Sequence, residues 1–242
     1  MSDIAVVTGA ARGIGLRIAA RLAAVGYRVI AADRDGATVE EEALRLRQDG
    51  LDVIGHGLDI TDRAAVAALF AELGSIQVLV NNAGIASQLV PLKSMTAQEL
   101  EAMIEVNVHG TFIVAQEGAR RMPGGGSIIN VASRGYLGGA GAAHYVASKA
   151  AVVGLTRAMA VELRWAGIAV NAVAPGMVET RMIKDFTDEM RLALISREPS
   201  GRAADPDDIA RAVVFLATDK ARLVNGQVLL LDGGKSIGVP PL

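Results

Sequence analysis

The chain has 242 residues, of which 51% are hydrophobic, 21% are charged and none is cysteine. This apolar fraction is sufficient to bury a large core, and the lack of cysteine excludes disulfides, thiolate nucleophiles and cysteine-bound metals. The formal net charge of -2 gives no electrostatic reason to expect nucleic acid or a membrane surface as a partner. The N-terminal residues do not resemble a signal peptide, and no run approaches the roughly 20 apolar residues of a membrane span, so we expect a cytoplasmic protein.

Short apolar runs alternate along the chain with longer segments of helical periodicity. In chain order, strands are expected at residues 4–7, 28–32, 53–58, 78–81, 127–132, 168–173 and 228–231. Helices are expected at residues 14–25, 39–46, 64–73, 97–121, 143–165 and 210–217. The alternation predicts right-handed crossovers and a parallel sheet with helices on both faces, a doubly wound α/β fold of Rossmann type. We expect one domain over 1–242, with residues 177–200 forming a cap over a site.

A glycine-rich turn lies between the first expected strand and the first expected helix. From Thr8 to Gly15 it reads T-G-x-x-x-G-x-G. Gly9 permits a sharp turn, while Gly13 and Gly15 have no Cβ and let the backbone approach a pyrophosphate. The helix that follows points its free N–H groups and its positive dipole end at the same place. The turn therefore predicts a dinucleotide-binding site.

This glycine spacing resembles the fingerprint of the short-chain dehydrogenase/reductase family. Later motifs extend the resemblance over the whole chain: N-N-A-G at 81–84, Y-x-x-x-K at 145–149 with Ser133 upstream, P-G at 175–176 and the ending at 226–234. The resemblance implies a Rossmann fold and transfer of a hydride between a nicotinamide cofactor and an alcohol or ketone. Family members often form tetramers through their long helices and C-terminal strand, so we expect a homotetramer.

Asp33 is the residue that favours one cofactor over the other. It ends the second expected strand, eighteen residues after Gly15. A carboxylate at this position accepts hydrogen bonds from an adenosine ribose and repels a 2′-phosphate, which favours NAD over NADP. Arg12 and Arg34 are the opposing signal, since either could pair with a phosphate. A fixed negative charge beside a phosphate dianion is costly, and NAD is therefore the expected cofactor.

The resemblance assigns further cofactor contacts along the chain. It implies that Asp59 holds the adenine amine, that the N-N-A-G motif lines the adenosine half of the cleft, and that the P-G turn lies against the nicotinamide, with Val178 and Thr180 at its carboxamide. The full expected cofactor site is Gly9, Arg12, Gly13, Ile14, Gly15, Asp33, Arg34, Asp59, Ile60, Asn81, Ala83, Gly84, Tyr145, Lys149, Pro175, Gly176, Val178 and Thr180.

Ser133, Tyr145 and Lys149 form the expected catalytic group. Tyr145 and Lys149 are four residues apart and share one face of an expected helix, and Ser133 ends the fifth expected strand. Reduction of a carbonyl needs a proton donor and a group that holds the carbonyl oxygen. A tyrosine hydroxyl can exchange the proton if a nearby ammonium, together with the cation of an oxidised nicotinamide, lowers its pKa, and a serine hydroxyl can orient the substrate. The resemblance carries over the same three roles, and it adds Asn107 as an asparagine that bends its helix and anchors a water next to Lys149.

The substrate is expected between the segment after Ser133 and the cap, against Ser133, Leu137, Tyr145, Met177 and Met182. This lining is mainly apolar, which favours a hydrophobic secondary alcohol or its ketone, although Arg134 could instead meet a carboxylate or a phosphate. No metal is expected, because His56, His109 and His144 lack ligand spacing.

Two alternative functions stay open at the level of the sequence. One is an NADPH-dependent 3-oxoacyl-[acyl-carrier-protein] reductase, which has the same fold and catalytic residues. The other is a non-catalytic NAD-binding sensor, which would need Asp33 and the glycines but not the catalytic group.

Overall fold

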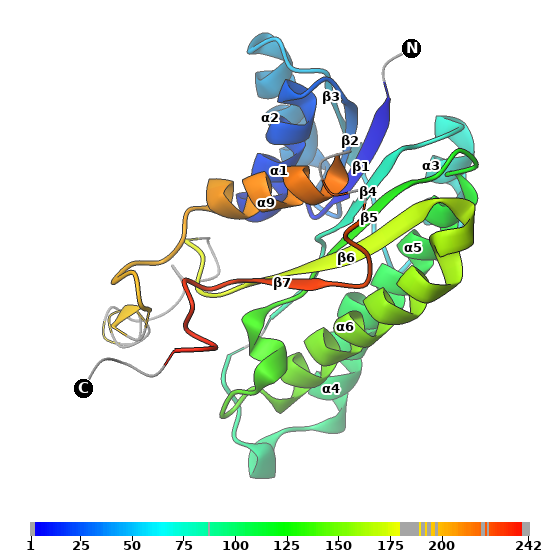
Figure 1. The fold of residues 1–242 in the computed structure, drawn as a ribbon. Helices are drawn as coiled ribbons and strands as arrows, with labels where there is room; N and C mark the ends of the chain where they lie inside the picture. Colours follow the sequence, from blue (N-terminus) through cyan, green and yellow to red (C-terminus); the bar gives the residue numbers. More distant parts are fainter. Residues whose placement is uncertain are drawn as a thin grey trace.

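The structure is a computed structural model and describes residues 3–86, 88–179, 189, 192, 195–196, 198–218, 221 and 223–238. A sheet of seven parallel strands forms the middle layer of this part of the chain, in the order β3-β2-β1-β4-β5-β6-β7 (Figure 1). The strands are β1 (Ile4–Thr8), β2 (Arg28–Asp33), β3 (Val53–Gly57), β4 (Val78–Asn81), β5 (Gly126–Val131), β6 (Ile168–Pro175) and β7 (Val228–Leu231). The prediction of a doubly wound, Rossmann-type parallel sheet is confirmed.

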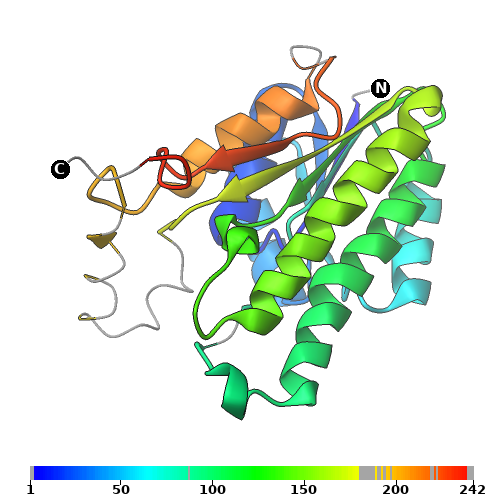
Figure 2. The same ribbon diagram turned by 60° about the horizontal axis from the view of Figure 1, so that its bottom comes forward.

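Helices cover both faces of the sheet (Figures 1 and 2). One layer contains α1 (Gly13–Ala24), α2 (Gly36–Gln48) and α9 (Pro206–Ala217), and the other contains α3 (Arg63–Leu73), α4 (Ala97–Ile104), α5 (Thr111–Arg120) and α6 (Ala143–Leu163). Short 3-10 turns occur at η1 (Leu92–Ser94), η3 (Arg134–Leu137) and η4 (Arg164–Ala166). Among the described residues, no helix is both long and apolar enough to cross a membrane.

Successive residues of β1 point into two separate hydrophobic cores, one on each face of the sheet. Val7 of β1 packs with Ile18 of α1 in the first core, whereas Val6 packs with Phe70 of α3 and Ile113 of α5 in the second. Side chains alternate between the faces of a strand, so a strand with helices on both sides must be apolar at every position. This is why β1 and β4 appear in the sequence as unbroken apolar runs.

Two helices begin earlier than the hydrophobic period predicts. α2 begins at Gly36 rather than at 39, because the Asp35 side chain accepts a hydrogen bond from the Thr38 N–H. α9 begins at Pro206 rather than at 210, since Asp205 and Asp208 form a capping box ahead of it. Capping depends on polar residues in the first turn, and an apolar pattern cannot show them.

The long helix expected at 97–121 is divided by a π-helical segment. This segment, η2 (Glu105–Gly110), separates α4 from α5 and contains Asn107, which is buried. π-Helical turns widen the i→i−4 ladder and occur frequently at functional sites. The expectation of one continuous α-helix was wrong: the helical type changes at the segment that contains Asn107.

The strand order reverses between β1 and β4. From β1 the chain proceeds outward to β2 and β3, and then returns past β1 to build β4 through β7 on the other side. Helices leave the two neighbouring strands on opposite faces, which opens a crevice at their carboxyl ends. The glycine-rich turn and the N-N-A-G motif follow these two strands, so the fold itself brings them together.

Candidate active site

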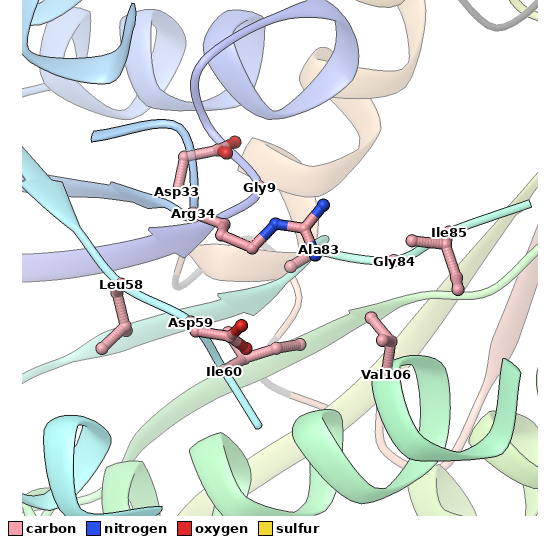
Figure 3. A pocket seen from close by; sticks show the side chains of 10 residues that line it. All are labelled: Gly9, Asp33, Arg34, Leu58, Asp59, Ile60, Ala83, Gly84, Ile85 and Val106. Carbon is pink, nitrogen blue, oxygen red and sulfur yellow. The ribbon is translucent and has the colours of Figure 1, made fainter. Parts of the chain in front are cut away.

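A pocket lies at the carboxyl ends of β1, β2 and β4 (Figure 3). Seven of its lining residues were expected from the sequence: Gly9, Asp33, Arg34, Asp59, Ile60, Ala83 and Gly84. Three others, Leu58, Ile85 and Val106, were not. Each of these three directly precedes or follows a predicted residue, and their apolar side chains gave no chemical signal in the sequence. The pocket lining therefore combines apolar side chains with three charged ones, Asp33, Arg34 and Asp59.

Asn82, which directly follows β4, holds the glycine turn in place. The Asn82 amide nitrogen donates to the carbonyl oxygens of Thr8 and Gly9, each at 2.9 Å. A Cβ on Gly15 would lie 2.1 Å from the Gly9 carbonyl oxygen, so only glycine fits there. Gly9 and Gly13 have positive φ angles of 66° and 56°, which glycine adopts without strain. Asn82 was missing from the predicted site, although its motif had been identified.

The Asp33 carboxylate is oriented by two backbone groups. One oxygen accepts the Ala11 N–H at 3.0 Å, and the other accepts the Asp35 N–H at 2.9 Å. Lone pairs on both oxygens stay available for the hydroxyls of a ribose. The carboxylate is thus held at the pocket wall by the loop that carries the glycine motif.

The two arginines that opposed the NAD assignment lie in different environments. Arg12 forms an ion pair with Asp35 at the surface. Arg34 instead lines the pocket, and Figure 3 shows its guanidinium extending into it. The pKa of Asp59 is lowered mainly by hydrogen bonds from the Thr61 N–H and hydroxyl, with a smaller contribution from the Arg34 charge. Arg34 is therefore the cation that an adenosine phosphate would meet first.

Ser133 and Tyr145 meet where β5 ends and α6 begins. The Ser133 hydroxyl caps η3 by accepting the Gly135 N–H at 3.0 Å, which sets its position at the strand end. Burial raises the pKa of Tyr145, and a hydrogen bond with the Ser133 side chain acts in the opposite direction. The protein groups alone thus raise the Tyr145 pKa on balance. The expected lowering combines the Lys149 ammonium with the charge of an oxidised nicotinamide and stays a prediction; among the protein groups alone, the desolvation of the phenol is the larger effect.

Lys149 is buried, with 6% of its surface exposed. Its ammonium donates to the Val131 carbonyl oxygen at 2.9 Å and lies 5.9 Å from the centroid of the Tyr145 ring. Burial lowers the pKa of Lys149 to about 8, because the charged form loses its hydration. Near pH 8, a little above physiological pH, about half of the Lys149 side chains are therefore neutral amines.

Asn107 connects the π-helical segment to the loop after β4. Its side-chain oxygen accepts the Ile85 N–H at 2.7 Å, and its nitrogen donates to the Ile85 carbonyl at 2.9 Å and to the Ser148 hydroxyl at 3.0 Å. A Cβ on Gly84 would lie 2.9 Å from the Asn107 oxygen and 3.5 Å from the Lys149 nitrogen. Asn107, Gly84 and Lys149 therefore meet at one point, and Ser148 is a further member of this network that the sequence reasoning missed.

Asn81 is buried in the protein and does not line the pocket. It is buried, and its side-chain nitrogen donates to the Asn130 oxygen at 2.9 Å, while Asn130 donates in turn to the Thr156 hydroxyl at 2.9 Å. These bonds join β4, β5 and α6. In the structure Asn81 therefore supports the floor of the site, and it is absent from the residues that line the pocket.

The P-G turn lies at the carboxyl end of β6 and is bonded to the neighbouring strand β7. The Gly176 N–H donates to the Leu231 carbonyl at 2.9 Å, and a Cβ on Gly176 would lie 3.0 Å from the Asp232 Cβ. Behind the turn, the buried Glu198 carboxylate pairs with Lys235 at 2.6 Å. Pro175, at the end of β6, pairs with Leu231 of β7. Nothing in the sequence marked Glu198 or Lys235, because the pair joins segments 37 residues apart.

Only parts of the expected cap belong to the described residues. Val178 forms an isolated parallel bridge with Ala204, and the Met177 carbonyl accepts the Ala204 N–H at 2.8 Å, so the start of the expected cap lies beside the segment that follows it. Thr180 and Met182 lie outside the described residues. Leu137 is exposed on η3, next to Ser133. Ile14 is the second residue of α1, at the glycine turn, and is partly buried against the first core.

A dinucleotide crevice at the reversal of a parallel sheet, next to a serine, a tyrosine and a buried lysine, is the arrangement of a nicotinamide-dependent oxidoreductase. Comparison with known families agrees: a family model described as enoyl-(acyl carrier protein) reductase matches residues 9–236. The chain belongs to the short-chain dehydrogenase/reductase family. It is an oxidoreductase that acts on CH–OH or keto groups.

Similar proteins match over nearly the whole chain. The chain is 41% identical to the (2S)-[(R)-hydroxy(phenyl)methyl]succinyl-CoA dehydrogenase subunit BbsD of Thauera aromatica, over 97% of this chain and 96% of that protein. It is 40% identical to the 3-oxoacyl-[acyl-carrier-protein] reductase FabG of Staphylococcus aureus, over 97% and 98%. A gluconate 5-dehydrogenase from Burkholderia cenocepacia, solved in complex with NADP and tartrate, aligns with a TM-score of 0.91 at 36% identity, over 98% of this chain and 96% of that one.

Proposed function

We propose that this protein is an NAD(H)-dependent dehydrogenase that interconverts a secondary alcohol and its ketone. The observation that carries the choice of NAD is the Asp33 carboxylate, which lines the adenosine pocket and is oriented by the N–H groups of Ala11 and Asp35. A carboxylate held there can accept hydrogen bonds from both ribose hydroxyls, whereas a 2′-phosphate would meet a fixed negative charge. The Arg34 guanidinium in the same pocket weakens this preference for NAD, but the repulsion between Asp33 and a 2′-phosphate stays in place.

In this proposal the catalytic roles are divided among residues that the fold brings together. When bound, the nicotinamide supplies or accepts the hydride. Tyr145 exchanges the proton with the substrate oxygen, and Ser133 donates a hydrogen bond that orients that oxygen. Lys149 holds the nicotinamide ribose and lowers the Tyr145 pKa only together with the positive charge of the oxidised ring, since Tyr145 is otherwise kept protonated by its burial. Asn107 positions the loop after β4 next to Lys149.

The second candidate is an NADPH-dependent 3-oxoacyl-[acyl-carrier-protein] reductase. It is favoured by the 40% identity to FabG of Staphylococcus aureus and by the position of Arg34 in the adenosine pocket. It requires that the Arg34 guanidinium pair with a 2′-phosphate in spite of Asp33. This cost is the reason that we place it second.

The substrate class is proposed more broadly than a single compound. The similar proteins carry names of dehydrogenases for a hydroxyacyl-CoA and, in Sinomonas cyclohexanicum, for cis-4-hydroxycyclohexanecarboxylate. Arg134, which follows Ser133 directly and is partly buried, adds a positive charge at this end of the site. Hydroxy acids and their thioesters therefore belong in any substrate panel, together with simple hydrophobic alcohols.

We further propose that the protein is a cytoplasmic homotetramer. Its support is the set of exposed apolar side chains on the outer helices, among them Phe112 of α5 and Val161 of α6, together with Leu229 on the edge strand β7. Exposed apolar patches of this kind mark interaction sites in soluble proteins.

The test is a two-cofactor activity assay. The pure protein is incubated with secondary alcohols, hydroxy acids and 3-hydroxyacyl thioesters, with NAD or NADP, and the reduced nicotinamide is followed by absorbance. We expect turnover with NAD that exceeds turnover with NADP. Turnover mainly with NADP on acyl thioesters would overturn the first proposal in favour of the second, and measurable NADH binding without turnover would favour a sensor.

A further inference from the structure

The helix that carries Tyr145 begins without an ordinary N-cap. α6 runs from Ala143, and Ala142 stands at the capping position with no side-chain hydrogen bond to the helix. The first backbone bond of the helix joins the Val146 N–H to the Ala142 carbonyl. The N–H groups before it have no partner within the helix, and a methyl side chain cannot accept from them. Tyr145 itself occupies the third helical position, whose N–H usually donates a hydrogen bond to the N-cap side chain.

His144 supplies the missing acceptor. Its ring nitrogen Nδ1 accepts the Tyr145 N–H at 2.9 Å, so the nitrogen carries no proton and the imidazole is held in one tautomer. The histidine is 1% exposed and is among the largest fully buried side chains of the described residues. Burial among packed neighbours fixes the ring in a single rotamer, and the ring in turn fixes the first turn of α6.

The position of this turn matters for the chemistry, because Tyr145 lies within it. The Tyr145 side chain must keep its hydrogen bond with Ser133, and Lys149 must stay one turn further along the same helix face. The neighbouring segment leaves little freedom: a Cβ on Gly135 would lie 3.2 Å from both the Ser133 hydroxyl and the Tyr145 ring. A first turn that frayed would move the phenol relative to Ser133, while the buried part of α6 that bears Lys149 would stay in place.

We infer that His144 is a positioning residue for the reaction, which caps the helix at Tyr145 in place of an N-cap side chain. The inference rests on the proposed role of Tyr145 as the acid/base. It assigns to His144 a contribution to turnover rather than to cofactor binding, because the adenosine pocket lies at β1, β2 and β4, away from this turn.

The experiment compares His144→Leu with His144→Asn. Leucine is apolar and cannot accept a hydrogen bond, whereas the asparagine Oδ1 lies the same number of bonds from the backbone as Nδ1 and can accept the Tyr145 N–H. We expect His144→Leu to lower kcat about tenfold or more with the KM for the cofactor unchanged. We expect His144→Asn to restore kcat to within about threefold of the wild type. His56→Leu, on the edge strand β3, is the matched control and should leave kcat unaltered.

Hydrogen exchange gives a readout that does not depend on turnover. The amide protection of a peptide covering residues 143–149 should fall in His144→Leu and return in His144→Asn. If both variants keep wild-type kcat and protection, His144 does not position Tyr145. If His144→Asn folds but does not recover kcat and amide protection, the hydrogen bond from the Tyr145 N–H is not what makes His144 necessary. Should the leucine variant not fold, His144→Phe, which keeps a ring without an acceptor, makes the same comparison. Loss of protection without loss of kcat would instead place the failure in the proposed role of Tyr145.

Discussion

At the scale of single residues, the site depends on two buried polar groups whose ionisation the fold disfavours. Burial raises the pKa of Tyr145 and lowers that of Lys149 to about 8. Each shift opposes the charged form, since both groups lose hydration and neither has an oppositely charged side chain among its causes. Under the proposed mechanism, the neutral phenol would be the proton donor for ketone reduction, and the reverse reaction would need the charge of an oxidised nicotinamide to lower the Tyr145 pKa.

The first prediction concerns Tyr145. In Tyr145→Phe the proton donor is lost while the ring still fills its buried site, so we expect kcat to fall about 100-fold or more. Binding of NADH, measured by fluorescence titration, should change little. Tyr27→Phe, which removes a hydroxyl between α1 and α9, serves as the control and should keep full activity. Full turnover in Tyr145→Phe would reject the catalytic assignment.

The second prediction concerns the choice of cofactor. Asp33→Ser removes the charge that would repel a 2′-phosphate and leaves Arg34 in the pocket. We expect the ratio of kcat/KM for NAD to that for NADP to fall about 10- to 100-fold, the range of one strong charged interaction. Asp52→Ser, which breaks an exposed pair with Arg28, is the control. An unchanged ratio would mean that Asp33 does not select the cofactor.

The third prediction follows from the pKa of Lys149. In the folded protein its pKa is about 8, against an ordinary value of 10.5. Between these values the unfolded chain holds the proton and the folded protein does not, so the free energy of unfolding rises with pH, by up to about 1 kcal/mol per pH unit. Below pH 8 both states are protonated and this contribution does not change.

Urea unfolding at pH 7.5, 8.5 and 9.5 measures this effect. Comparison with Lys149→Met isolates it, because other groups titrate alike in both proteins. The wild type should gain stability relative to the variant as the pH rises. A difference that is constant over this range would show that the folded-state pKa is not lowered.

At the scale of elements, polar side chains decide where helices begin, bend and end. The expected helix at 97–121 is divided at η2, where Asn107 bonds to Ile85 and Ser148 instead of facing solvent. The early starts of α2 and α9 have the same kind of cause. Hydrophobic periodicity locates the middle of each helix, because burial determines it, but it cannot locate ends that depend on side-chain hydrogen bonds.

The fourth prediction tests the π-helical segment. Asn107→Leu keeps the volume but leaves the Ile85 N–H without its acceptor in a buried place. We expect a loss of about 2 kcal/mol in the free energy of unfolding and a fall in kcat, because the loop after β4, which lies next to Lys149, loses its anchor. Gln116→Leu, on the exposed side of α5, is the control. If Asn107→Leu has wild-type stability, the asparagine does not hold this loop.

At the scale of the whole molecule, the strand order places the site, and the outer helices carry the exposed apolar side chains on which the proposed assembly rests. Every strand of the sheet is parallel, so all the predicted motifs that follow strands arrive at one edge. On the outer surface, Phe112 is 40% exposed, Val161 60% and Trp165 85%. These residues belong to α5, α6 and the turn after it, and α5 and α6 lie next to each other (Figure 2).

The fifth prediction concerns the proposed tetramer. Val161→Glu places a charge on the exposed face of α6, and burial of that charge at an interface would be costly. We expect light scattering coupled to size exclusion to show a smaller assembly than the wild type, with the circular dichroism spectrum unchanged. Leu44→Glu, at a residue that is 50% exposed on α2 in the opposite layer, should leave the mass unaltered. A wild-type mass for Val161→Glu would exclude this face from the interface.

The sequence alone was enough to predict the order of strands and helices, the Rossmann-type sheet and most residues around the pocket. Burial on both faces makes parallel strands apolar throughout, and the glycine turn must be glycine for steric reasons, so both features are visible along the chain. Only the tertiary structure revealed the contacts that hold the site residues in place. They are the bonds of Asn82 to the glycine turn, Ser148 beside Asn107, the Glu198–Lys235 pair behind Gly176, and the hydrogen bond from the Tyr145 N–H to His144. Most of these contacts join residues far apart in the chain, and their strength depends on burial, which only the folded protein determines. The direction of the Tyr145 pKa shift belongs to the same group, because desolvation is a property of the packed molecule.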